Sequence, residues 1–323
     1  MKVRLLKQNG WSGRCGFSAW CGLMVMGMVL GQPCAVRAED EKTFATPQAA
    51  VDALTAAIEA KDTNALHAMF GPSGHQLVSP DAVEATNDFN LFAKRLKEKA
   101  TLVKVGESTN ELDIGADSWP FPIPLVNHGG GWFFDTDAGR EEIMNRRIGA
   151  DELQTIQVCH AYVEAQREYA SELRDGSDVL QYAQLLRSSP GKRDGLYWKV
   201  EPGEELSPLG PLIAEAHNEG YRHSSKIMTS EPAPYHGYYF KILTKQGRHA
   251  PGGKYNYIIN GHMIAGFALV AWPEQWNNTG VMTFIVNQQG KVYQKNLGPK
   301  TDSIAPGMAT FDPDSSWTWV GAK

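Results

Sequence analysis

The last third of the chain alternates short runs of aromatic and β-branched residues with corners of Gly, Pro and Asn, a pattern typical of strands. Asn260-Gly261 is the only connection between the second and third runs, and it suits a type I′ turn because both central residues need positive φ. The pattern predicts an antiparallel β-meander with one mobile, arginine-bearing connection at residues 246–254. The expected strands are Tyr238–Leu243, Tyr255–Ile259, His262–Trp272, Val281–Asn287 and Lys291–Lys295.

Apolar positions between residues 46 and 99 recur instead at helical spacing. Three helices are expected, beginning at Thr46-Pro47, at Asp62 and at Ser79-Pro80. Short strand-like segments follow them: Thr101–Val105, Glu111–Ile114, Pro122–Val126 and Gly131–Phe134. The alternate prolines of Trp119–Leu125 remove backbone donors, which predicts that this ribbon protects a sheet edge; the alternative is that it presents aromatic side chains to a partner.

The middle of the chain reads as two successive helices capped by Asp137 and Asp151, then a short helix over Val179–Leu186 and a proline-rich connection. The fold class predicted is α+β. Its expected parts are a signal peptide (1–38), a helix-and-sheet, cone-like domain (39–136), a helical segment with a loop-rich linker (137–233) and a C-terminal antiparallel sheet domain (234–323).

The first residues match a secretory signal. Cationic positions precede an uncharged run from Gly16 to Gly31, and Val36-Arg37-Ala38 supplies small residues for cleavage after Ala38. The run is shorter than the roughly 20 residues that a spanning helix needs. We therefore expect a periplasmic or secreted protein without stable membrane insertion, the alternative being an uncleaved anchor.

The net charge of the mature chain narrows the possible partners. Removing residues 1–38 takes away five of the 31 Lys and Arg and none of the 36 Asp and Glu, which leaves a net charge of −10. Such a domain is not built to bind nucleic acid by bulk electrostatics.

Cys159 is the only cysteine left after removal of residues 1–38. Its position near the apolar stripe of its helix predicts a buried, inert thiol.

Several strings resemble the exported bacterial family catalogued as domain of unknown function 2950, over about Phe44 to Val320. The strings are Trp119–Leu125, Asn145–Gly149, Pro190–Trp198, Ser207–Leu212, Tyr235–Phe240 and Gly266–Pro273. The resemblance implies export and one long unit, and it carries no established activity.

Two looser likenesses concern parts of the chain. Gly237–Phe240, Thr283–Val286 and Gly290–Tyr293 are similar to strands of the globular head of pilin-type proteins, although the long assembly helix of pilins is missing. The helices and strands of residues 46–134 resemble the nuclear-transport-factor-2-like fold, which implies a pocket.

Three histidines lie on the predicted C-terminal sheet or its loops. His236, His249 and His262 could bind zinc if strand pairing brought them together, but isolated histidines at strand ends are more often hydrogen-bonded. No metal and no other cofactor is therefore predicted.

The loop from Gln246 to Lys254 is the preferred ligand-binding candidate. Its glycines free the backbone, and the guanidinium of Arg248 could clamp a carboxylate or a pair of sugar hydroxyls. The competing interpretation is a hairpin loop with solvated charges. The predicted ligand-binding residues are His236, Tyr238, Arg248, His249 and Tyr255.

The sequence contains no Gly-x-Ser-x-Gly, His-Glu-x-x-His or phosphate-binding glycine loop. The leading hypothesis is a non-catalytic protein that binds a small ligand or an envelope protein. One alternative is a hydrolase or lyase acting on an envelope polymer, with His236, Arg248 and His249 as base and anion clamp. The other is a structural pilin-like subunit.

Overall fold

The computed structural model describes residues 41–174, 176–201, 203–204, 206–221 and 233–321. The predicted signal peptide (1–38) and residues 222–232 of the predicted linker lie outside these ranges. Helices and mainly antiparallel sheets are both present, so the predicted α+β class is confirmed. Among the described residues, no helix combines the length and the apolar character needed to cross a bilayer.

Three helices and a short 3₁₀ segment, η1 (Pro72–Leu77), precede the first sheet, as the sequence predicts. The helices are α1 (Pro47–Ala60), α2 (Thr63–Phe70) and α3 (Ala82–Glu98). Each begins at a side-chain cap, and Asp81 caps α3 by accepting the backbone N–H groups of Val83 and Glu84. The helices pack on one core with the sheet β1 (Ala100–Lys104), β2 (Thr109–Ile114), β3 (Trp119–His128) and β4 (Gly131–Phe134), in that order.

The proline ribbon lies at a sheet edge only locally, because β3 is not the last strand of its sheet. β3 is an interior strand, paired with β2 on one side and β4 on the other. The four residues of β4 pair only with Leu125–His128, so the proline-bearing half of β3 has a single partner, β2. Prolines without a backbone donor are tolerated there because β4 does not extend along them.

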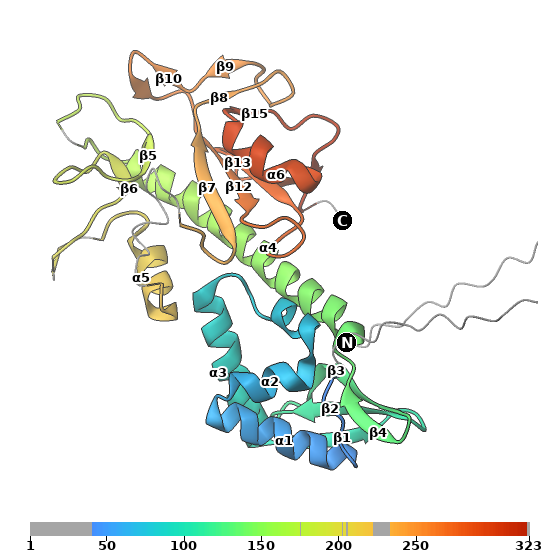
Figure 1. Cartoon of the computed structure of the whole chain (residues 1–323). Coiled ribbons are helices and arrows are strands. Elements are labelled where there is room, and N and C mark those ends of the chain that lie inside the picture. Colours follow the sequence, from blue (N-terminus) through green and yellow to red (C-terminus); the bar gives the residue numbers. More distant parts are fainter. Residues whose placement is uncertain (1–40, 175, 202, 205, 222–232, 322–323) are drawn as a thin grey trace, which may run out of the picture. The chain divides into compact units, whose positions relative to one another are not determined.

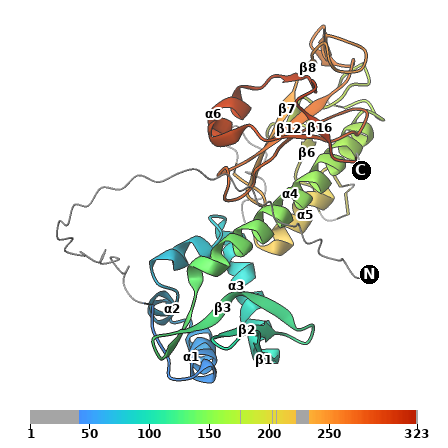
Figure 2. The same ribbon diagram turned by 90° about the vertical axis from the view of Figure 1, so that its right-hand side faces the viewer.

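The two helices predicted for the middle of the chain are one helix, α4 (Thr136–Tyr169), of 34 residues and about 50 Å. Its N-cap is Asp135 rather than Asp137, and Asp151 lies buried in its interior. An Asp inside a helix costs only about 0.7 kcal/mol relative to Ala and does not end it. α4 runs from the first sheet to the second (Figures 1 and 2).

The helix predicted over Val179–Leu186 is absent. Residues 185–187 form β5 (Leu185–Arg187), which pairs in parallel with β6 (Gly195–Tyr197). A long-range contact holds this segment out of a helix. The buried side-chain amide of Gln166 in α4 donates a hydrogen bond to the carbonyl of Ala183 and accepts one from its backbone N–H. α5 (Gly210–Glu219) follows.

The C-terminal sheet has the order β16-β14-β13-β12-β7 and is antiparallel throughout. Its strands are β7 (Tyr238–Leu243), β12 (Ala268–Pro273), β13 (Thr283–Asn287), β14 (Tyr293–Lys295) and β16 (Thr318–Trp319). β12 and β13 are buried along their whole length and pack against the second half of α4, where the Tyr162 hydroxyl donates to the Ala268 carbonyl.

The predicted reversal at Asn260-Gly261 is confirmed, with φ of 51° and 85°. It joins β10 (Ile258–Ile259) and β11 (His262–Met263), which form a separate two-stranded sheet. The predicted strand His262–Trp272 divides at Gly266, which has a φ of 149° and where a Cβ would lie 2.9 Å from the Tyr257 ring. The smaller sheet of β15 (Thr310–Phe311), β8 (Lys245–Gln246) and β9 (Tyr255–Asn256) and the short helices η3 (Gly298–Lys300), α6 (Thr301–Ile304) and η4 (Ala305–Gly307) complete the fold.

Candidate functional site

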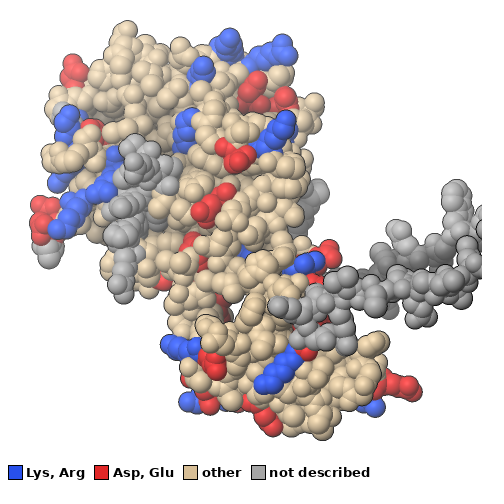
Figure 3. All heavy atoms as spheres, in the orientation of Figure 1, with Lys and Arg blue, Asp and Glu red and all other residues tan. Residues whose placement is uncertain are grey.

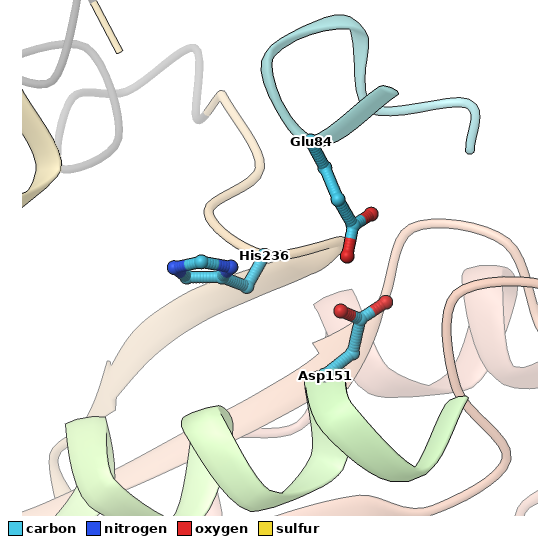
Figure 4. Close-up of side chains that lie close together, drawn as sticks. All are labelled: Glu84, Asp151 and His236. Atoms are coloured by element: carbon cyan, nitrogen blue, oxygen red, sulfur yellow. The ribbon is translucent and has the colours of Figure 1, made fainter. Parts of the chain in front are cut away.

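Three polar side chains from distant parts of the sequence meet where α3, α4 and the turn before β7 lie together. Glu84, Asp151 and His236 each offer a ligand atom, and these three atoms lie within 4.8 Å of one another. Within the described ranges they form the only such group of three His, Cys, Asp or Glu side chains. The two carboxylates face each other, and one ring nitrogen of His236 lies on their side (Figure 4). We call these residues the carboxylate–histidine cluster.

The first turn of α3 positions Glu84. Asp81 fixes that turn through its cap, and its second oxygen accepts the Tyr221 hydroxyl at 2.8 Å. The Ser79 hydroxyl donates to Glu84 Oε2. Glu84 is therefore held at one oxygen and only half-buried, so its side chain is oriented and still accessible from solvent.

Asp151 comes from the middle of α4, one helical turn after Arg147. Both are buried, with Asp151 only 1% exposed. The Arg147 guanidinium donates to Asn278 Oδ1 at 2.8 Å and to the Leu77 carbonyl at 2.6 Å. Asp151 Oδ2 is buried without a hydrogen-bond partner among the described residues. A buried polar atom left in this way calls for an explanation.

A strained turn positions His236. His236 and Gly237 have φ of 45° and 65°, and the turn is closed by two backbone hydrogen bonds between Tyr235 and Tyr238. A Cβ on Gly237 would lie 2.5 Å from Thr279 Cβ and 3.1 Å from Asp151 Oδ2, so glycine is needed there. The turn thereby brings His236 beside Asp151.

The second ring nitrogen of His236 has its own partner. Nε2 lies 3.1 Å from Glu219 Oε2, which also accepts the Tyr235 hydroxyl at 3.1 Å. An ionised carboxylate only accepts hydrogen bonds, so this pairing places the imidazole proton on Nε2. The lone pair of Nδ1 is then free to face the carboxylates of Glu84 and Asp151.

The electrostatics of the cluster favour a bound proton or cation. Burial, the Glu84 charge and a hydrogen bond with Glu84 together raise the pKa of Asp151 from 3.8 to about 10, against the opposing effect of Arg147. Two ionised carboxylates have no donor to share, so such a bond requires a proton on one of them. The two carboxylates therefore share a proton at neutral pH.

A pocket adjoins Glu84. It measures about 290 Å³ and is lined by Glu84, Asp88 and Arg147 together with apolar side chains such as Leu77, Phe92 and Trp119. A second cavity of about 400 Å³ lies between α2, α3, α4 and β3. The two share Leu77, Asp88, Phe92, Phe121 and Ile143 as lining residues, so they are neighbours. We call them together the α3 pocket.

The residues predicted from the sequence are not brought together. His236 belongs to the cluster, whereas Tyr238 lies in the core with its hydroxyl donating to the Met282 carbonyl. Arg248 Nε donates to His249 Nε2, and His249 Nδ1 lies 3.1 Å from Asp312 Oδ1. Tyr255 stacks edge-on against Tyr257.

The Gln246–Lys254 loop is anchored at two points. The buried Gln246 amide donates to the carbonyls of Pro251 and Gly253, both at 2.7 Å, and the backbone N–H of His249 donates to Asp312. These bonds hold the loop backbone, which differs from the mobile connection that the sequence suggested. His262 bonds Gln181, so His236, His249 and His262 each have a different partner.

Sequence reasoning missed Glu84, Asp151 and Glu219. From the sequence, Asp151 was interpreted as the cap of the second of two successive helices. One signal was available, since Glu84 with Asp88 and Arg147 with Asp151 are each spaced four residues apart and so share a helix face.

The fold and the cluster define an α+β protein with a carboxylate–histidine cluster beside a pocket. The chain belongs to the family described as "Protein of unknown function (DUF2950)", whose sequence profile matches residues 41–320. No curated protein and no solved structure matches the chain.

Proposed function

We propose that the protein is exported and binds a small amphipathic ligand in the α3 pocket without turning it over. The observation that carries the proposal is the pocket itself, whose apolar walls end at Glu84, Asp88 and Arg147. Its two cavities, of about 290 and 400 Å³, fall in the size range of small-molecule sites, which are mostly apolar with a few convergent polar groups.

The ligand class follows from the lining. Aromatic rings form the wall between the cavities, with Phe92 and Phe121 centroids 5.1 Å apart. The guanidinium groups of Arg95 and Arg146 lie 5.5 and 5.0 Å from the centroid of the Trp119 ring, and all three residues line the pocket. An apolar or aromatic body would fill this space, and its polar end would meet the charged residues.

The place of action is part of the same proposal. The signal-like residues 1–38 support export to the periplasm or beyond, and an envelope molecule is the expected partner. Helices followed by a four-stranded sheet support the likeness to the nuclear-transport-factor-2-like fold and its pocket. Basic and acidic side chains are interspersed on the face shown in Figure 3, which supports the expectation that nucleic acid is not a partner.

Catalysis by the residues predicted from the sequence has less support. His236 bonds Glu219, whereas Arg248 and His249 are tied to each other and to Asp312. Cys159 is buried, as predicted, and burial raises the pKa of its thiol to about 12, so it is no nucleophile. The pilin-like alternative draws its support from the antiparallel order of β7, β12, β13 and β14.

The test uses an uncharged fluorescent naphthylamine probe and two tryptophan substitutions on α4. Ile143→Trp places an indole in the pocket, whereas Leu153→Trp places the same indole at a position that is 65% exposed. We expect saturable probe binding that Ile143→Trp weakens at least tenfold and Leu153→Trp leaves unchanged. Equal binding by both variants, or no saturable binding by the parent protein, would refute the proposal.

A further inference from the structure

We propose that the carboxylate–histidine cluster binds one divalent transition-metal ion through Glu84, Asp151 and Nδ1 of His236. This inference does not depend on the ligand proposed for the α3 pocket. It rests on the buried oxygen of Asp151 that lacks a partner, on the convergence of three donors and on the way the histidine is oriented.

The buried oxygen shows that the cluster is built for a ligand. Asp151 is 1% exposed and aims its carboxylate at Glu84, and within the part of the chain that the structure describes its Oδ2 has no hydrogen-bond partner. The hydrogen bonds of Arg147 go to Asn278 and to the Leu77 carbonyl. A metal ion between Asp151 and Glu84 would give this oxygen a partner and would compensate the charge of the two carboxylates.

The spacing of the donors suits an ion after a small contraction. Zinc is bound at about 2.0–2.2 Å by carboxylate oxygen and imidazole nitrogen, so the donors of a tetrahedral site lie roughly 3.4 Å apart. The three ligand atoms here lie within 4.8 Å of one another. Glu84 and His236 are only half-buried, so side-chain rotation can close the difference while Asp151 stays fixed.

The surroundings of the histidine match those of metal ligands. A metal-binding histidine almost always donates its other ring N–H to a carboxylate, a carbonyl or water, which fixes its tautomer and orientation. Glu219 occupies that place at 3.1 Å and is itself held by the Tyr235 hydroxyl. On the opposite side Ser79 holds Glu84. Glu219 is thus a positioning residue for His236.

The donor set selects the class of metal. One imidazole and two carboxylates favour zinc, manganese, cobalt or nickel over magnesium and calcium, which prefer all-oxygen sites. Three protein ligands leave at least one position for water or for a polar group of another molecule.

Titration calorimetry of chelator-stripped protein at pH 7 with ZnCl₂, MnCl₂ and MgCl₂ tests this proposal. We expect one Zn²⁺ per chain, bound at least 100-fold more tightly than Mg²⁺. Glu84→Gln, Asp151→Asn and His236→Ala should each weaken Zn²⁺ binding more than tenfold. Glu219→Gln should weaken it roughly 10- to 100-fold.

His249→Ala is the matched control, since His249 also lies 3.1 Å from a carboxylate but outside the cluster. It should bind Zn²⁺ like the parent protein. A four- or five-coordinate Co²⁺ site gives intense visible absorption bands. The spectrum of the Co²⁺-loaded parent protein therefore tests the site without relying on a variant that fails to fold. Absence of saturable Zn²⁺ binding, binding that survives Asp151→Asn and His236→Ala, or equal loss in His249→Ala would overturn the proposal.

Discussion

Replacing Asp151 by Asn should change how stability depends on pH. The two side chains have the same shape, and the amide of Asn can donate to Glu84, which Asp151 can do only when protonated. The substitution therefore removes a buried titratable group without opening a cavity. In the presence of a chelator, no metal ion can mask its effect.

The size of the effect follows from the pKa of Asp151, which burial and Glu84 raise from 3.8 to about 10. Between these values the folded chain holds one proton more than the unfolded chain, so the free energy of unfolding falls as pH rises. The stability linked to Asp151 is complete below about pH 4 and is lost progressively toward pH 10. Each pH unit costs about 1.4 kcal/mol, so pH 5 to pH 8 costs about 4 kcal/mol.

Urea denaturation from pH 5 to pH 8 measures this slope. The parent protein should lose stability as pH rises, whereas Asp151→Asn should lose up to about 4 kcal/mol less over the same range. Glu84, Asp81 and Arg147 face Asp151 and stay in place in both proteins, so their own titration appears in both curves. Glu141→Gln, an exposed acid on the same helix, is the control and should follow the parent protein. Parallel curves for the parent protein and Asp151→Asn would refute the reasoning.

Three other predictions concern the loop, the helix packing and export. Gln246→Ala removes two hydrogen bonds from the side-chain amide to the carbonyls of Pro251 and Gly253. It should destabilise the protein by about 1–3 kcal/mol and speed hydrogen exchange of the backbone amides of residues 247–254. Unchanged exchange in these residues would contradict the anchoring of the loop. Gly139→Ala should cost about 1–3 kcal/mol in thermal or urea unfolding, because a Cβ there would lie 2.7 Å from Ile123 Cα, whereas an unchanged midpoint would exclude that contact. Mass spectrometry of exported protein should find Glu39 as the first residue, and retention of residues 1–38 would refute cleavage after Ala38.

Local chemistry explains which parts of the fold were predictable. Asn260-Gly261 fixes its own reversal, because positive φ at both positions is a property of those two residues. β7 was predicted with its observed bounds, since Tyr238–Leu243 is an uninterrupted run of strand-forming residues. By contrast, β4 pairs with only the last residues of β3 and leaves the prolines at a local edge, which no pattern within β3 reveals.

The candidate site was less predictable because its parts are distant in sequence. Asp151 contacts a helix that begins about 70 residues earlier and a turn about 85 residues later, and only the fold brings them together. From the sequence alone, Asp151 was interpreted as a helix cap. His236 was selected for its place beside a predicted strand, but its partner Glu219 lies across the proline-rich connection. A histidine alone does not indicate which carboxylate will orient it.

The most direct test of the carboxylate–histidine cluster is anomalous diffraction from crystals grown with one equivalent of Zn²⁺ and measured on both sides of the zinc edge. We predict a single strong peak within bonding distance of Glu84, Asp151 and His236 Nδ1, with Nε2 of His236 still on Glu219. A map with no peak between these residues, or with zinc only at His249 and Asp312, would contradict the account.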